Sequence, residues 1–333
     1  MAFITPGLGL GGAPKRVAFI TPGLGLGGAE RWVASCIRHF TAAVTVVGVF
    51  TPDVNGALAP EIGRYTQVHP LGEVQHVASD VVLAWGYPKV GELVPREKLI
   101  AVSHGAAELE WAKRCCEPME RDSARLAAVS GDAARVWHRG PVEIIPNGAE
   151  LDRICPRRGR EFMRRALDIA PHERIALYLG RLSPEKRPEI MAQMADFLPP
   201  QWRVIVAGPA CGASIPAHPR VKVLPAVSHP GDLLAAADCF VLPSMTEGHP
   251  IALTEAWLAS VPTVYADWPF AAEMRARHGA HPGTVVPING TPEQWATAVV
   301  QSRHIDTDFA RGLAWQHYTA PRMAQQWEDL ILR

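Results

Sequence analysis

The chain has 333 residues, 48% of them hydrophobic and 20% charged, and its 33 lysines and arginines balance 33 aspartates and glutamates. This length fits two domains, and the balanced charge gives no sign of a dedicated nucleic-acid binder, although a neutral total can contain a local basic patch. The sequence shows no apolar run of membrane-spanning length and no signal-peptide pattern, and its six cysteines show no CxxC pair or zinc spacing. We therefore predict free thiols and a cytoplasmic location.

A repeat of twelve residues opens the chain, because AFITPGLGLGGA occupies positions 2–13 and again 18–29. Only one copy can form the first strand and loop of a domain. The second copy continues into ERWV, which is typical of a helix, whereas the first runs into Pro14 and Lys15. We therefore interpret residues 1–14 as a duplicated leader and expect it to be disordered.

Short apolar stretches alternate with helical spacing along the rest of the chain, which predicts α/β domains with parallel sheets. A link with Pro146, Gly148 and Pro156 separates two such series. The predicted strands are 15–21, 43–50, 80–85, 98–103, 126–130 and 142–145, then 174–179, 202–207, 221–224, 239–242 and 262–265. The predicted helices are 29–40 and 131–138, then 188–197, 232–237, 251–260, 291–301 and 322–332.

The most informative motif, SMTEGHPIALTE, covers residues 244–255 and lies between a predicted strand and a predicted helix. Pro250 suits the first turn of a helix, and Gly248 before it lets the backbone approach a ligand closely. The N–H groups of that turn and the helix dipole form an anion site. The flanking Glu247 and Glu255 suit sugar or ribose hydroxyls better than phosphate. The alternative is a capped turn with solvated glutamates.

Two cations follow another predicted strand in the segment GRLSPEK, which begins at Gly180. Arg181 offers a planar fork to phosphate and Lys186 a point charge, at the strand end where α/β folds bind ligands. The alternative is a solvated turn in which Arg181 pairs with Glu185.

The glycine loop at 23–28 resembles a dinucleotide fingerprint, but the acidic residue expected about 20 positions later is missing, and Asp53 is a poor substitute. We interpret the loop as a backbone-lined cleft wall, with a simple tight turn as the alternative. His104, in the sequence VSHG, also follows a strand and is expected to face the cleft, with a structural role as the alternative.

Together these segments resemble family 4 of the retaining glycosyltransferases, which have the GT-B fold. The resemblance rests on GGAE at 27–30, SHG at 103–105, AVSGDAARVW at 128–137, VEIIPNGAEL at 142–151, YLGRLSPEKRPEIM at 178–191, VIVAGP at 204–209 and LAAADCFVLPSMTEGHPIALTEAWLASVPTV at 234–264. It implies two Rossmann-like domains facing each other across a cleft, an acceptor domain at 15–152 and a nucleotide-sugar donor domain at 153–312. A final segment at 313–333 would return to the first domain.

The resemblance also implies transfer of a sugar, with retention of configuration, from a nucleotide-diphosphate sugar to a hydroxyl acceptor. UDP-sugars are favoured and GDP-mannose comes next, and the acceptor is a glycan, a lipid, a small molecule or a modified nucleic acid. The implied catalytic residues are His104, Arg181, Lys186 and Glu247. The implied donor-binding residues are Gly27, Gly28, Gly180, Gly248, His249, Pro250, Ile251, Ala252 and Glu255.

Two departures from the family pattern affect these expectations. Many relatives have Phe where this chain has His249, which affects the donor-sugar pocket. The first domain is short, so knowledge of acceptors transfers poorly.

We expect no metal, no cofactor and no obligate protein partner. The triplet Asp306-Thr-Asp308 lies between late helices, where we interpret it as a helix cap rather than a metal site.

Other functions remain open at this stage: a nucleotide-sugar epimerase or phosphorylase of the same fold, a non-catalytic sugar-binding protein and, less favoured, an NAD-dependent oxidoreductase. Six arginines in 153–165 are interpreted as a solvated linker and helix face rather than a nucleic-acid site. Peripheral docking at the inner membrane face also stays open, through Leu109, Trp111, Lys113 and Arg114. The alternative interpretation of these residues is ordinary helix amphipathicity.

Overall fold

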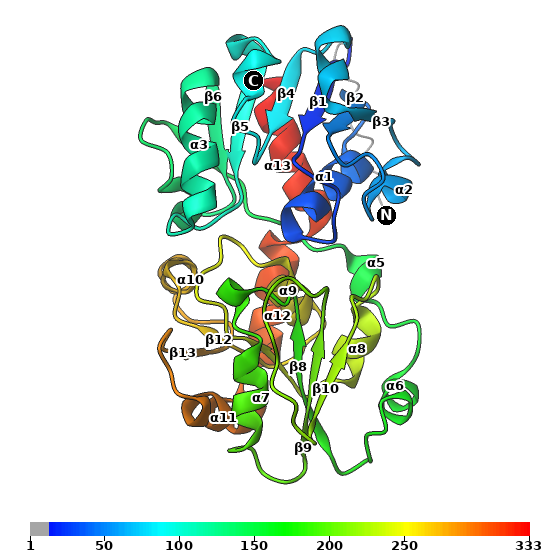
Figure 1. The fold of residues 1–333 in the computed structure, drawn as a ribbon, viewed down its shortest axis with the longest axis vertical. Coiled ribbons are helices and arrows are strands. Elements are labelled where there is room, and N and C mark those ends of the chain that lie inside the picture. Colours follow the sequence, from blue (N-terminus) through cyan, green and yellow to red (C-terminus); the bar gives the residue numbers. More distant parts are fainter. Residues whose placement is uncertain (1–12) are drawn as a thin grey trace, which may run out of the picture.

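A computed structural model describes residues 13–333 and contains two α/β lobes, one above the other in Figure 1. Most of the predicted leader at 1–14 lies outside these residues, and its last two residues, Ala13 and Pro14, are exposed. Within the described part of the chain, no helix has both the length and the apolar composition that a membrane span requires. The two-domain α/β prediction is confirmed.

Each lobe is built on a parallel sheet in which the chain starts near the middle, runs to one edge and then returns to build the other side. The first sheet has the order β3-β2-β1-β4-β5-β6-β7 and the second β10-β9-β8-β11-β12-β13. The strands of the first sheet are β1 (Lys15–Ile20), β2 (Val44–Thr51), β3 (Val68–Pro70), β4 (Val81–Ala84), β5 (Leu99–Ser103), β6 (Arg125–Ala128) and β7 (Val142–Ile144). Those of the second are β8 (Arg174–Leu179), β9 (Trp202–Ala207), β10 (Val221–Leu224), β11 (Cys239–Leu242), β12 (Thr263–Ala266) and β13 (Thr284–Val286).

Helices connect the strands and cover the sheets. The N-terminal lobe has α1 (Gly28–His39), α2 (Ala59–Ile62), α3 (Glu110–Asp122) and α4 (Gly131–Ala134), with 3₁₀ turns at Leu71–His76, Val90–Glu92 and Arg96–Lys98. The link and the C-terminal lobe have α5 (Leu151–Ile154), α6 (Arg160–Ala166), α7 (Glu189–Ala195), α8 (Gly231–Ala236), α9 (Ile251–Leu258), α10 (Pro269–His278), α11 (Pro292–Gln301) and α12 (Thr307–His317), with 3₁₀ turns at Pro184–Lys186 and Ser302–His304. The last helix is α13 (Ala320–Leu332). The helix predicted at 131–138 ends early, at Ala134, because the chain turns there and Trp137 donates to the carbonyl of Ala127 on β6.

The last helix crosses back and completes the core of the N-terminal lobe (Figure 1). Met323 and Trp327 of α13 pack in one cluster with Phe19 and Trp32, and the indoles of Trp32 and Trp327 meet at 5.0 Å. The returning segment begins at Ala320 rather than at the predicted residue 313. The preceding helix α12 belongs to the C-terminal core, into which it buries Leu313.

The chain therefore passes between the lobes twice, and the two crossings are hydrogen-bonded to each other. Ala149 donates to the carbonyl of Tyr318 at 2.9 Å, and Ala320 donates to the carbonyl of Ala149 at 2.9 Å. A Cβ on Gly148 would overlap the carbonyl group of Thr319. Glycine is thus required where the two crossings meet.

Gly148→Ala is expected to lower the free energy of unfolding by at least about 2 kcal/mol, because backbone atoms at the double crossing cannot yield to a methyl group. Urea denaturation followed by circular dichroism measures the change. Gly312→Ala is the control, since Gly312 lies inside α12 with nothing within 4 Å of the added carbon. The control should be neutral or stabilised by up to about 1 kcal/mol. Equal stability of the two variants would contradict the constraint at the crossing.

Candidate active site

A cavity of about 740 Å³ lies between the lobes, at the carboxyl ends of the central strands. Its walls come from the loops after β1 and β4 in one sheet and after β8 and β11 in the other, where the direction of sheet building reverses. Open parallel sheets bind ligands at this position. The cavity brings together all the site residues predicted from the sequence, namely His104, Arg181, Lys186, Glu247, Gly27, Gly28, Gly180, Gly248, His249, Pro250, Ile251, Ala252 and Glu255.

The turn before α9 is pressed against the opposite lobe. A Cβ on Gly248 would lie 2.6 Å from the carbonyl oxygen of His104, so only glycine allows this approach. Asn147 reinforces the contact, because its amide donates to the carbonyl of His249 at 3.0 Å. Pro250 then caps α9 without a side-chain hydrogen bond, which leaves a helix N-terminus at the cavity wall.

Lys186 and Glu247 form a buried pair beside this turn. The ammonium of Lys186 lies 2.7 Å from Glu247 Oε2, and the hydroxyl of Ser244 donates to Oε1 at 2.7 Å. The glutamate side chain is only 9% exposed. Lys186 thus neutralises a carboxylate that would otherwise repel an anion in the cavity.

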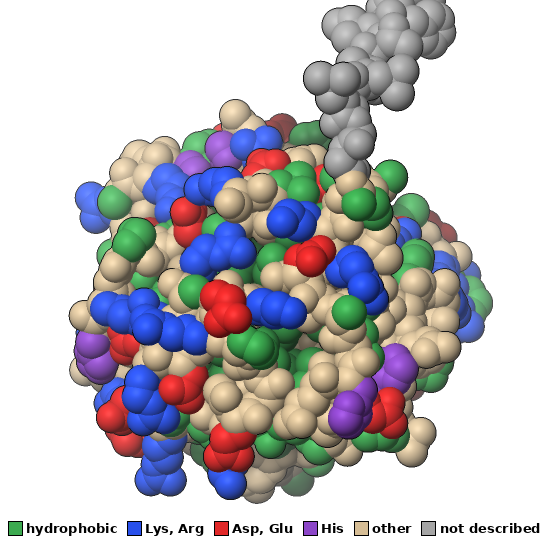
Figure 2. All heavy atoms as spheres, turned by 90° about the horizontal axis from the view of Figure 1, so that it is seen from above, with side chains coloured by type: hydrophobic (Ala, Val, Ile, Leu, Met, Phe, Trp, Pro, Cys, Tyr) green, Lys and Arg blue, Asp and Glu red, His purple; other side chains and the backbone are tan. Residues whose placement is uncertain are grey.

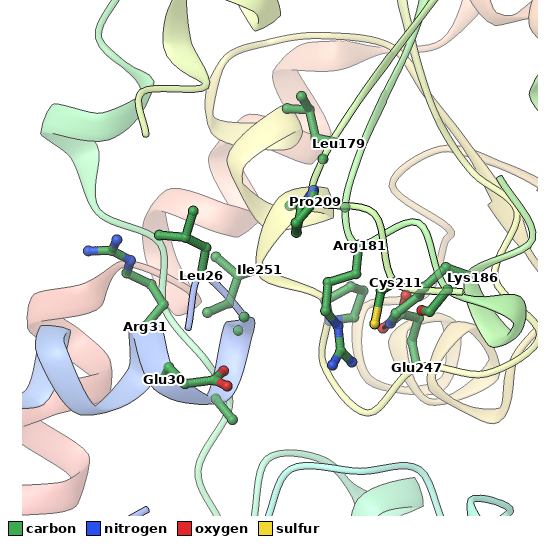
Figure 3. A pocket seen from close by; sticks show the side chains of 18 of the residues that line it. Leu26, Glu30, Arg31, Leu179, Arg181, Lys186, Pro209, Cys211, Glu247 and Ile251 are labelled. Carbon is green, nitrogen blue, oxygen red and sulfur yellow. Dashed lines mark hydrogen bonds and ion pairs between the residues drawn. The ribbon is translucent and has the colours of Figure 1, made fainter. Parts of the chain in front are cut away.

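Arg181 extends freely into the cavity. Its side chain is 49% exposed, and Glu185 lies 3.7 Å away, a separation typical of a loose surface pair. The Arg181–Glu185 pair considered from the sequence therefore exists, but it leaves most of the guanidinium available. Figure 3 shows Arg181 on one side of the cavity and Glu30 on the other.

Arg153 is a cavity residue that the sequence analysis missed. Its Nε lies 3.1 Å from Glu255 Oε1, and its Nη1 donates to the carbonyl of Ser228 at 3.0 Å. The interpretation of 153–165 as a solvated linker is thus wrong at this position. It is also wrong for Arg164, which is buried and contacts Asp238.

The glycine loop forms a cleft wall, as predicted. Gly27 and Gly28 line the cavity at the start of α1, and a Cβ on Gly28 would come within 3.8 Å of Ile251 in α9. The N-termini of two helices, one from each lobe, therefore approach each other across the cavity. Their dipoles both favour an anion between them.

His104 packs among aromatic rings at the cavity wall. The centroid of its ring lies 4.7 Å from that of Trp32 and 5.7 Å from that of Trp85. Burial lowers the pKa of His104 to about 3, so its imidazole is neutral at physiological pH. Neither ring nitrogen has a hydrogen-bond partner among residues 13–333.

His249 packs against two aromatic rings, with ring centroids 4.9 Å from Phe270 and 5.0 Å from Tyr318. Burial lowers the pKa of His249 to about 3, and neither ring nitrogen has a partner in the described chain. The ring thus fills a site suited to an apolar aromatic side chain, while its backbone contacts Asn147.

The triplet at 306–308 has the predicted capping role, because Asp306 accepts from the backbone N–H groups of Asp308 and Phe309 at the start of α12. Within the described residues, no three His, Cys, Asp or Glu side chains are grouped so that they could hold a metal ion. All six cysteines are free thiols.

Comparison with known proteins agrees with this architecture. Residues 173–303 match the model of the family described as glycosyl transferases group 1. The match covers most of the C-terminal lobe, which is therefore similar to this family.

Curated relatives of this group 1 domain include the D-inositol 3-phosphate glycosyltransferase of Mycobacterium tuberculosis (strain ATCC 25618 / H37Rv). It is 32% identical over 141 residues, which cover 38% of this chain and 29% of the relative. The matched region is thus less than a third of the relative's length.

Solved structures show the fold of the whole chain. Anabaena Alr3699/HepE in complex with UDP-glucose superposes with a TM-score of 0.81 at 18% identity, covering 96% of this chain and 99% of that one. WaaG, a glycosyltransferase involved in lipopolysaccharide biosynthesis, superposes with a TM-score of 0.70 at 16% identity, covering 95% and 99%. The two lobes with the group 1 domain therefore form a GT-B fold, as predicted.

His249→Phe is expected to stabilise the protein by about 1–3 kcal/mol at neutral pH, because it removes two buried nitrogens without partners. It should also flatten the acid limb of the stability profile. In the unfolded chain histidine binds its proton near pH 6.5, whereas folded His249 does so only near pH 3. The unfolded state therefore binds more protons between these values, and the free energy of unfolding falls as pH falls through this window.

Urea denaturation at a series of pH values measures both effects. The variant should lose up to about 1.4 kcal/mol per pH unit of this slope. Exposed His172, replaced by glutamine, serves as the control and should keep the wild-type slope. A His249→Phe profile parallel to wild type would show that the buried imidazole has a partner.

Proposed function

We propose that this protein is a retaining glycosyltransferase that moves a sugar from a nucleotide-diphosphate sugar to a hydroxyl acceptor. The observation that supports it most is the convergence of Arg181, Lys186 and the N-terminus of α9 on one cavity between two Rossmann-like lobes. Arg181 and the helix N-terminus suit a diphosphate, and Lys186 keeps the nearby carboxylate of Glu247 from repelling it. A UDP-sugar is the favoured donor, since the similar HepE structure holds UDP-glucose, and GDP-mannose is the second candidate.

The residues would divide the donor between them. Arg181 and Lys186 would hold the diphosphate, with the backbone of Gly248 and Ile251 beside it and Gly28 closing from the other lobe. Glu247, already fixed by Ser244 and Lys186, would accept from hydroxyls of the donor sugar. The remaining donor-binding positions, Gly27, Gly180, His249, Pro250 and Ala252, would contribute backbone surface.

Cleavage of the sugar–phosphate bond would place negative charge on the leaving diphosphate as the anomeric carbon becomes oxocarbenium-like. Arg181, Lys186 and the helix dipole are already in place to stabilise that charge, so no metal is needed in this proposal. A leaving phosphate oxygen would take the acceptor's proton on the same face, which retains the configuration. His104, neutral and close to that face, would contact sugar and acceptor.

We expect Arg181→Ala to reduce transfer at least about a hundredfold while leaving the melting temperature unchanged, because Arg181 is half exposed and makes only a loose pair. Lys186→Ala should also abolish transfer, but with a lower melting temperature, since it leaves buried Glu247 without its counter-ion. Lys222→Ala, a partly exposed cation of the same lobe, is the control.

The donor is first identified by thermal shift with UDP-, GDP- and ADP-sugars, because a ligand that binds only the folded state raises its melting temperature. Product analysis with that donor then separates transfer from epimerisation or phosphorolysis. Binding of no nucleotide sugar, or full activity of Arg181→Ala, would overturn the proposal.

Arg153 is expected to orient Glu255 for the ribose, since it holds Oε1 and leaves Oε2 for a hydroxyl. Arg153→Ala should weaken UDP binding about tenfold and reduce the preference for UDP over 2′-deoxy-UDP. Titration calorimetry with both nucleotides measures the ratio of the wild-type and variant affinities for UDP, and the ratio of the affinities for UDP and 2′-deoxy-UDP in each protein. Arg157→Ala is the matched control, because Arg157 is an exposed residue of the same linker that does not line the cavity. Unchanged discrimination in Arg153→Ala would contradict this role.

A further inference from the structure

The C-terminal lobe forms one wall of the cavity, which carries Arg181 and Lys186 and is called the cationic wall below. The N-terminal lobe forms a second wall with different chemistry, called the N-terminal wall. It consists of the loop after β1, Trp85 after β4, His104 after β5, and Leu109 and Trp111 at the start of α3. Large apolar side chains are exposed there, since Leu26 is 44% and Trp111 43% accessible. An exposed aromatic ring and an exposed leucine in a concave site are typical of a ligand-binding surface.

Trp111 is held in place rather than left loose. A Cβ on Gly105 would lie 3.0 Å from the six-membered ring of Trp111, so the indole packs directly over that glycine. The absence of a side chain at the glycine of the SHG sequence thus makes room for the ring. An aromatic ring that packs on one face and is accessible on the other offers a surface to a ligand with an apolar face.

The charge of this wall excludes one class of ligand. Its cation, Arg31, is held by both carboxylate oxygens of Glu61 at 2.7 Å. Glu30 has no ion-pair partner among residues 13–333, and burial raises its pKa. His104 is neutral. A phosphorylated acceptor would therefore meet a carboxylate and no available cation on this side of the cavity.

We infer that the N-terminal wall is a binding site for a neutral sugar ring, which stacks its C–H face on Trp111 and offers hydroxyls to Glu30. This inference rests on the proposed function, because the ring would be the acceptor. Carboxylates accept hydroxyl hydrogen bonds, and an aromatic face suits the apolar side of a pyranose. The D-inositol 3-phosphate named for the curated relatives has a charge that this wall does not match.

The test compares methyl β-D-glucopyranoside with its 6-phosphate, two probes that share a ring and differ in charge. Binding is followed by saturation-transfer NMR with UDP-2-fluoroglucose present, an unreactive donor that fills the donor subsites. Wild type should bind the neutral glycoside more tightly than the phosphate. Trp111→Ala should weaken glycoside binding about tenfold, a change typical of the loss of an aromatic contact. Trp315→Ala, which removes an exposed tryptophan on α12 in the other lobe, should leave it unchanged.

Three results would overturn the inference: equal or tighter binding of the 6-phosphate, unchanged glycoside affinity in Trp111→Ala, or no glycoside binding at millimolar concentrations. Failure of the proposed function is distinguishable, because none of the nucleotide sugars in the thermal-shift screen would then bind. The glycoside measurements without nucleotide would still report on Trp111, which belongs to the N-terminal wall and not to the wall that carries Arg181.

Discussion

The structure depends on one close contact, where the backbone at Gly248 meets the carbonyl of His104 from the opposite lobe. A larger residue would separate the lobes here and move the N-terminus of α9 away from the N-terminal wall. The Asn147–His249 hydrogen bond fixes the same turn from the interdomain link. The cationic and apolar walls thus face each other at a fixed separation, which two independently folded domains joined by a flexible linker would not provide.

The return of α13 gives this contact its stiffness. Because Trp327 and Met323 complete the core of the N-terminal lobe, the last helix cannot leave without exposing a large apolar surface. Its first residues are hydrogen-bonded to Ala149 on the other crossing, so the lobes share a two-stranded connection. The end of the N-terminal lobe seen in Figure 2 shows basic and acidic side chains interspersed.

The sequence predicts the central strands and the binding motifs at their carboxyl ends, because both depend on local residue patterns. The central strands β8, β9 and β11 were predicted with their observed bounds, and GRLSPEK and SMTEGHPIALTE indicated the cationic wall, because each follows a buried strand. Edge strand β3 and helix α3 were not assigned as elements, since their patterns are short or mixed. Arg153 and Trp111 acquire their positions only through tertiary contacts, with Glu255 and Gly105. No local pattern could separate Arg153 from its five neighbouring arginines.

The opposite character of the two walls is what the proposed sugar transfer would need. In that reaction the leaving diphosphate would need fixed positive charge, which the half-exposed Arg181 would supply. The attacking hydroxyl has the opposite need, because cations beside it would hold its oxygen lone pairs and reduce its nucleophilicity. On the N-terminal wall, Arg31 is paired with Glu61 and burial keeps His104 neutral, so the carboxyl group of Glu30, whose pKa burial raises, is left to accept a hydroxyl. A wall of this kind would bind a hydroxyl without withdrawing its electrons, and the contact at Gly248 holds it close to the cationic wall.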